Sequence, residues 1–80
     1  MTRAFLFHDV YAVYIWGERD GRHHRPHAHI CVRGTRIATV FLETLDVYDE
    51  SERIPKALME EIRARQDDLV TLWIEVNENE

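Results

Sequence analysis

Residues 5–16 read FLFHDVYAVYIW, and this run of aromatic and β-branched residues decides the fold. Such a composition is typical of β-strands. Along residues 10–16, apolar side chains fill both sets of alternating positions, so both faces of the strand are apolar and a helix must cover one of them. His8 and Asp9 offer an alternative, because a turn there would make residues 5–7 a separate short strand.

The residues that follow predict the rest of a sheet. Residues 17–26 are polar and rich in turn-forming residues, and a loop of this length in a small domain is often functional. Residues 27–33 resume a strand, and Gly34-Thr35 is expected to turn the chain tightly into a strand over residues 36–42. A short strand over residues 46–48 completes the sheet.

A helix is expected over residues 55–76. Pro55 stands in its first turn, where the missing N–H leaves no hydrogen bond unmade. Apolar residues recur at steps of three and four, which forms one stripe able to pack on the sheet. The stripe consists of Leu58, Ile62, Leu69, Leu72, Trp73 and Val76. We therefore predict one α+β domain over residues 1–80, an antiparallel three- to four-stranded curved sheet packed against one long C-terminal helix.

The charge of the chain is divided unevenly between its halves. The 80 residues carry a net charge of −5, yet residues 1–40 hold six arginines against three acidic residues. Residues 41–80 hold four basic residues against twelve acidic ones. An acidic half argues against direct nucleic-acid binding and suits a protein that meets a basic surface. The alternative is that these carboxylates only solvate the outer face of the helix.

Size and composition also bound the class of protein. A chain this short leaves little room for both a core and a deep pocket, so a flat binding surface is the easier function to build. The single cysteine, Cys31, excludes an internal disulfide and fits a reducing compartment. No run approaches the roughly 18 apolar residues of a membrane span. We expect a cytoplasmic protein with no membrane association.

Histidines are concentrated in the segment that enters the second strand. Four of the five lie within residues 23–29. On a strand, His27, His29 and Cys31 share one face, and imidazole and thiolate are zinc ligands. Because a straight row of three such residues is about 13 Å long, a third metal ligand would have to come from another segment. The candidates for it are His8, Asp9 and His24.

Two other interpretations of His27 and His29 stay open. In one, they form hydrogen bonds across the sheet and pin the loop to it. In the other, they contact a phosphate or carboxylate group together with Arg22 and Arg25. Nucleophilic catalysis is not favoured, because Cys31 lies in an apolar strand without an evident activating base. We expect no enzymatic activity and no cofactor.

Three segments carry a resemblance to a known family. They are residues 26–29 (PHAH), residues 43–48 (ETLDVY) followed by 54–58 (IPKAL), and residues 66–73 (QDDLVTLW). In this order they resemble DUF4160, a family of small prokaryotic domains, over roughly residues 5–75. The loop before the first motif is more basic than the family pattern.

The resemblance implies an antiparallel sheet packed against one long helix. It also implies a role in defence or stress biology, because members often look like partners in toxin–antitoxin-type gene pairs. In size and acidity the chain is similar to small anti-CRISPR proteins directed against type I CRISPR surveillance complexes. This likeness implies an inhibitor that blocks target DNA from the complex.

Three hypotheses follow for function. The first is a protein-binding inhibitor that occupies the basic DNA channel of a type I (I-C-like) CRISPR surveillance complex and contacts one of its subunits. Its expected binding residues are Asp49, Glu50, Glu52, Glu60, Glu61, Asp67 and Asp68, or alternatively Arg19, Arg22, His23, His24 and Arg25. The second is a toxin–antitoxin component that contacts a cognate partner or nucleic-acid phosphates through Arg22, Arg25, His27, His29 and Arg33. The third is a small metal-dependent enzyme centred on His27 and His29.

Overall fold

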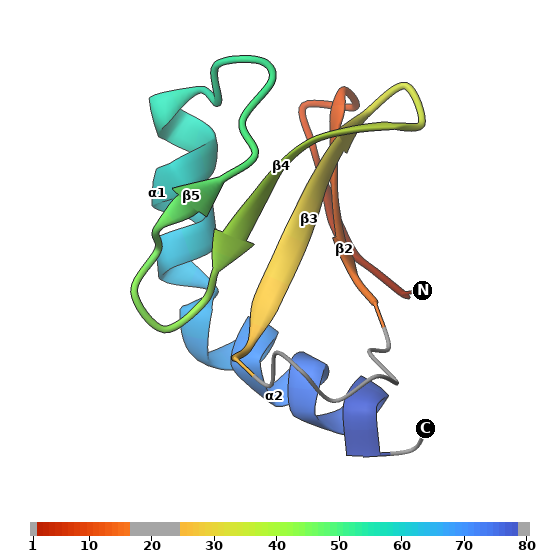
Figure 1. The fold of residues 1–80 in the computed structure, drawn as a ribbon, viewed down its shortest axis with the longest axis vertical. Helices are drawn as coiled ribbons and strands as arrows, with labels where there is room; N and C mark the ends of the chain where they lie inside the picture. The colour runs from red at the N-terminus through yellow and green to blue at the C-terminus, as the bar shows by residue number, and fades with distance from the viewer. Residues whose placement is uncertain (1, 17–24, 79–80) are drawn as a thin grey trace.

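The computed structural model describes residues 2–16 and 25–78, which form five strands and two helices (Figure 1). The strands pair antiparallel with their chain neighbours in the order β1-β2-β3-β4-β5. The predicted α+β class is confirmed, but the expected three to four strands and single helix are corrected. The elements are β1 (Thr2–Phe7), β2 (Tyr11–Ile15), β3 (His27–Val32), β4 (Thr35–Phe41), β5 (Val47–Tyr48), α1 (Lys56–Ala64) and α2 (Gln66–Glu78).

The extra strand arises because the expected single strand over residues 5–16 is a hairpin. His8 and Asp9 have φ values of 52° and 56°, and the N–H of Val10 donates to the carbonyl of Phe7 over 3.1 Å. Positive φ at both central residues is the backbone that hairpin turns require, and His and Asp enter this region more readily than most residues. The alternative turn at these two residues is therefore correct, and β1 extends back to Thr2.

The turn between β3 and β4 lies one residue earlier than predicted. Arg33 and Gly34 occupy its centre with φ values of 52° and 81°, and Thr35 already pairs with Val32 in the sheet. Gly34 suits this position because it has no Cβ to clash at positive φ. The shift adds Thr35 to β4, which begins one residue before the predicted strand.

The expected helix over residues 55–76 is divided by a bend at Arg65, so that α1 and α2 run in clearly different directions (Figure 1). Arg65 has φ −103° and ψ 11°, outside helical values. Tertiary contacts hold the bend. Gln66 Nε2 donates to the carbonyl of Leu42 over 2.6 Å, and the Arg65 guanidinium lies over the Phe5 ring at 4.3 Å.

One face of the sheet packs on the helices and forms the core. Alternation along the strands directs Val13, Ile15, Ala28, Ile30 and Val40 to this side, where all five are fully buried. The predicted helical stripe meets them: Leu58, Ile62, Leu69 and Trp73 are buried, and Leu72 and Val76 pack at its edge. α2 contacts β1, β2 and β3. The other face of the sheet is therefore left without a helix over the described residues.

Within the described residues, neither helix has the length and apolar character needed to cross a membrane.

Candidate functional site

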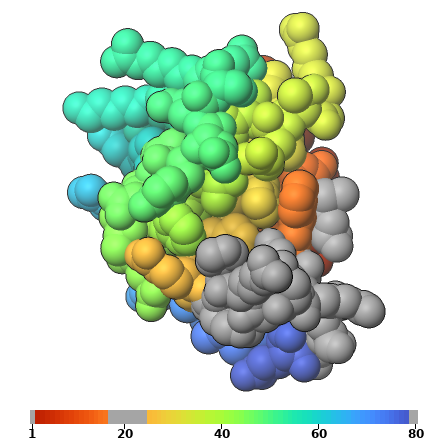
Figure 2. Space-filling view, viewed as in Figure 1, coloured from red at the N-terminus to blue at the C-terminus, as the bar shows by residue number. Residues whose placement is uncertain are grey.

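The helix-free face of the sheet, called the sheet face below, carries rings where an exposed antiparallel face usually carries polar side chains. The register aligns Tyr14, His29, Thr39 and Tyr48 across β2, β3, β4 and β5. His27 is opposite Phe41 in the same way. Side chains of β4 and β5 (yellow-green and green) form the middle of the surface in Figure 2, and those of α1 project beyond them on the left.

The rings touch one another in a continuous row, called the ring row below. Trp16 stacks on His29 with centroids 3.9 Å apart, and His29 meets His27 edge-on at 5.1 Å. His27 then contacts Phe41 at 6.1 Å, and Phe41 contacts Tyr48 at 4.7 Å. The guanidinium of Arg25 covers the ring of Phe41 at 4.6 Å, a cation–π contact.

His27 and His29 are buried within this row and hydrogen-bonded. Nδ1 of His27 lies 2.9 Å from the carbonyl oxygen of Arg25 and donates to it, because a carbonyl only accepts. Nδ1 of His29 lies 3.3 Å from the hydroxyl of Thr39 on β4. The hydroxyl accepts a hydrogen bond from Arg36 over 3.2 Å, so its own proton can go to His29. The expected bonds across the sheet and to the end of the loop are both present.

Burial shifts the pKa of two groups on this face. It lowers the pKa of His29 to about 4, with smaller contributions from the charges of His27 and Arg36. His29 is therefore a neutral ring at physiological pH. Burial also raises the pKa of the Cys31 thiol, against the opposing charge of Arg36. A thiol with a raised pKa is a weak nucleophile at neutral pH.

Of the residues proposed as further metal ligands, His8 and Asp9 do not join His27 and His29. His8 and Asp9 form the β1–β2 turn, beside Tyr11, which pairs with Val32 at the far end of β3 from His27. His24 lies outside the described residues. Over residues 2–16 and 25–78, no three His, Cys, Asp or Glu side chains are grouped as a metal site would need.

The phosphate contacts predicted for the second hypothesis are separated as well. Arg33 lies in the β3–β4 turn, at the opposite end of β3 from Arg25 and His27. His27 and His29 are only 8% and 7% exposed, so a phosphate cannot reach their rings in this conformation. Arg19, Arg22, His23 and His24 lie outside the described residues.

Two of the hollows in the surface border a strand or the turn between two strands. One, of about 220 Å³, opens on the sheet face between Tyr14, Trp16, Cys31, Gly34 and Arg36.

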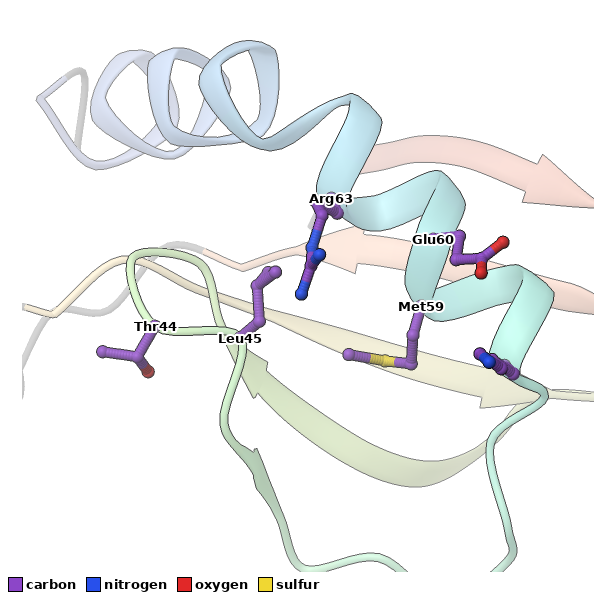
Figure 3. Close-up of a pocket in the computed structure, with 6 residues that line it drawn as sticks. Thr44, Leu45, Met59, Glu60 and Arg63 are labelled. Carbon is purple, nitrogen blue, oxygen red and sulfur yellow. The ribbon is translucent and has the colours of Figure 1, made fainter.

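The other hollow, of about 320 Å³, lies between the β4–β5 turn and α1 (Figure 3). Met59 and Arg63 reach from α1 toward Leu45, and Glu60 points to the side. Lys56 also lines it, so its rim mixes charges of both signs.

The seven candidate carboxylates come from three segments, the loop after β5, α1 and the first turn of α2. In the loop after β5, Asp49 pairs with Arg36 at 3.9 Å, and Glu50 accepts a hydrogen bond from the N–H of Ile54 over 3.2 Å. Glu52 is exposed in the same loop. On α1, Glu61 pairs with Arg65, and Glu60 is flanked by Lys56 and Arg63. Asp67 and Asp68 lie in the first turn of α2.

The strands and helices differ in the charge that they carry. The five strands contain two arginines and no Asp or Glu. α1 holds two cations and two carboxylates, whereas α2 holds four carboxylates and no cation. The exposed residues of α2 fall on one side of the helix, called the acidic face below. It consists of Asp67, Asp68, Thr71, Ile74, Glu75 and Glu78.

Sequence reasoning did not assign Tyr14, Phe41, Tyr48, Arg36 and Thr39 to a site. For all but Arg36, the signal was the strand register, because period-two alternation places them on the same face as His27 and His29. Arg36 reaches this face only through the register shift between Ile30 and Cys31, which leaves Ile37 without a partner in β3. That register becomes visible only when the hairpin turns are placed correctly.

Comparison with protein-family models, with curated proteins and with solved structures found no match to this chain. The resemblance to DUF4160 and to anti-CRISPR proteins therefore stays a prediction.

Proposed function

We propose that this chain is a non-enzymatic binding protein that occupies the basic, nucleic-acid-binding surface of a larger complex. The observation that carries the proposal is the acidic face of α2. Four carboxylates project from a helix that contains no cation, and exposed Ile74 lies among them. A helix of this kind presents a line of negative charge to a groove built to hold phosphates.

The composition of the acidic face suits docking better than solvation alone. Ile74 is 40% exposed at the middle of the face, where an apolar side chain would be desolvated by a partner, while the carboxylates surround it. Glu60 and Glu61 on α1 lie beside cations, so they contribute little net field. α2 therefore supplies the charge that a basic partner would meet first.

The likeness to anti-CRISPR proteins selects the first partner to test, a type I CRISPR surveillance complex. In this proposal α2 lies in the channel that receives target DNA, and the bound protein excludes the duplex by charge and volume. No chemical step is needed. This is consistent with a Cys31 thiol of raised pKa and with a His29 ring that is buried and hydrogen-bonded.

The test uses a purified type I surveillance complex and two variants that each remove three negative charges. The α2 variant combines Asp67→Asn, Asp68→Asn and Glu78→Gln. The control combines Glu43→Gln, Glu52→Gln and Glu60→Gln, all exposed and outside α2. We expect wild type to bind the complex and block target-duplex binding, the α2 variant to bind about tenfold or more weakly, and the control to bind like wild type.

Two results would contradict the proposal in different ways. Equal weakening by both variants would show that acidity in general, and not α2, governs binding. Absence of any complex with wild-type protein would remove the CRISPR complex as the partner. Recovery of a small cognate protein from the native host in its place would then favour the toxin–antitoxin alternative.

A further inference from the structure

The sheet face differs from the rest of the molecule in both its rings and its charge. Tyr48 is 48% exposed, and Tyr14, Trp16 and Phe41 are half-buried, so parts of four aromatic rings reach solvent. Solvent-facing sheet surfaces usually carry polar side chains, because nothing packs on them. A face that keeps aromatic rings in water indicates a ligand that packs on rings.

The strands contribute positive charge and no Asp or Glu to this face. Arg3 lies opposite Tyr14 in the register of β1 and β2, and Arg36 lies opposite Cys31 in the register of β3 and β4. The guanidinium of Arg25 covers the ring of Phe41. All three arginines are exposed. Within the described residues, Asp49 pairs with Arg36 at 3.9 Å, and because 75% of its side chain is exposed this pair holds Arg36 only weakly.

Rings and guanidinium groups on one face of the sheet match the chemistry of a single nucleic-acid strand. Every base has a π-face that stacks on an aromatic ring, and the arginines can neutralise the backbone phosphates. A duplex does not offer its base faces, since each is covered by the neighbouring pair. The hollow beside Tyr14 and Trp16, about 220 Å³, is smaller than the ~300–1,000 Å³ of ordinary small-molecule pockets. It suits one base better than a whole metabolite.

We infer that the sheet face binds single-stranded nucleic acid, with bases stacked on Tyr14, Trp16 and Tyr48 and phosphates held by Arg3, Arg25 and Arg36. The inference does not rest on the proposed function, because the acidic face of α2 contributes nothing to this surface. It also differs from the phosphate contacts predicted by sequence, since His27 and His29 act here as the buried support of Trp16 and Phe41.

The first experiment titrates the protein with a ten-nucleotide oligo(dT) and with a duplex of the same length. Binding is followed by the anisotropy of a labelled oligonucleotide and by the fluorescence of Trp16 in a Trp73→Phe background. We expect binding of the single strand at micromolar concentration, quenching of Trp16, and much weaker binding of the duplex. With three phosphate contacts, log K should fall against log salt with a slope of about −2.

Matched variants locate the site. Tyr48→Ala should weaken oligonucleotide binding about fivefold or more, the loss expected for one stacked base. Arg25→Ala should weaken binding. It should also make the slope of log K against log salt less steep, by the amount expected for the loss of one phosphate contact. Arg53→Ala removes an exposed arginine from the loop before α1, and it should leave both quantities unchanged.

Several outcomes would overturn the inference. They are no anisotropy change with wild-type protein at 100 μM oligonucleotide, equal affinity for duplex and single strand, and equal losses in Arg25→Ala and Arg53→Ala. If Tyr48→Ala and Arg25→Ala instead abolish capture of a protein partner while no oligonucleotide binds, the sheet face is a protein interface. Anisotropy with wild-type protein keeps the test valid if Trp73→Phe fails to fold.

Discussion

His29 lies between the indole of Trp16, the ring of His27 and the hydroxyl of Thr39. Its pKa is lowered from 6.5 to about 4, first by burial and then by the charges of His27 and Arg36. The unfolded chain binds a proton near pH 6.5, and the folded chain does so only near pH 4. Between these values the unfolded state holds more protons, so the free energy of unfolding must fall as the pH is lowered.

We therefore predict acid sensitivity that is traceable to His29. Between pH 7 and pH 4.5, wild type should lose about 2 kcal/mol more stability than His29→Asn, which keeps an acceptor for Thr39 and cannot titrate. Urea unfolding at a series of pH values measures this difference. His8→Asn, which removes an exposed imidazole, should keep the wild-type slope. Parallel slopes for wild type and His29→Asn would show that other groups cause the acid sensitivity.

For single residues, the sequence included hydrogen bonding among the interpretations of His27 and His29, but it did not predict the groups to which they bond. Alternation was enough to place both on one face with Cys31. Thr39 and Arg25 could not be predicted as partners, because the pairing of β3 with β4 depends on a bulge between Ile30 and Cys31. A one-residue slip in that register would move Thr39 to the other face.

At the element scale, α2 places carboxylates at both of its ends. Asp67 and Asp68 in the first turn are stabilised by the positive end of the helix dipole. Glu78 lies in the last turn, which contains no basic residue, and there a carboxylate meets the negative end of the dipole. A carboxylate at a position that lowers stability is consistent with a role in binding.

Two charge reversals on α2 should therefore separate stability from binding. Glu78→Lys should raise the free energy of unfolding by about 0.3–1 kcal/mol, whereas Asp67→Lys should lower it by a similar amount. Both should weaken binding to the basic partner, because both remove negative charge from the acidic face. Denaturant unfolding and partner titration give the two quantities. A loss of stability in Glu78→Lys would mean that the dipole does not govern this helix end.

The elements themselves were largely predictable, and the errors have physical causes. Period-two alternation identified β3 and β4 to within one residue, and the apolar stripe identified the buried side of both helices. The apolar stripe did not indicate the bend at Arg65, because Leu58, Ile62 and Leu69 keep their helical spacing across it. It is fixed by the hydrogen bond from Gln66 to the end of β4, a contact between residues 24 positions apart.

At the scale of the whole molecule, a net charge of −5 conceals an ordered distribution. From the acidic second half of the chain, the sequence predicted a partner with a basic surface and disfavoured nucleic acid, since position along the chain does not show which face a charge lies on. The fold places arginines and rings on the sheet face and carboxylates on α2. A helix is about 10–12 Å across. The screening length is about 8 Å at physiological ionic strength, so charges on the far side of a helix act only weakly across it.

This separation predicts that the two surfaces act independently. The variant Asp67→Asn, Asp68→Asn, Glu78→Gln should bind oligo(dT) within about twofold of wild type at 0.15 M salt, because its charges are screened from the sheet face. Arg25→Ala and Tyr48→Ala should likewise leave affinity for the basic partner unchanged. The affinity of each variant for oligo(dT) and for the basic partner tests both expectations. If either set of changes weakened both interactions to the same extent, the partner and the oligonucleotide would share one surface, and the assignment of separate roles to the sheet and to α2 would be wrong.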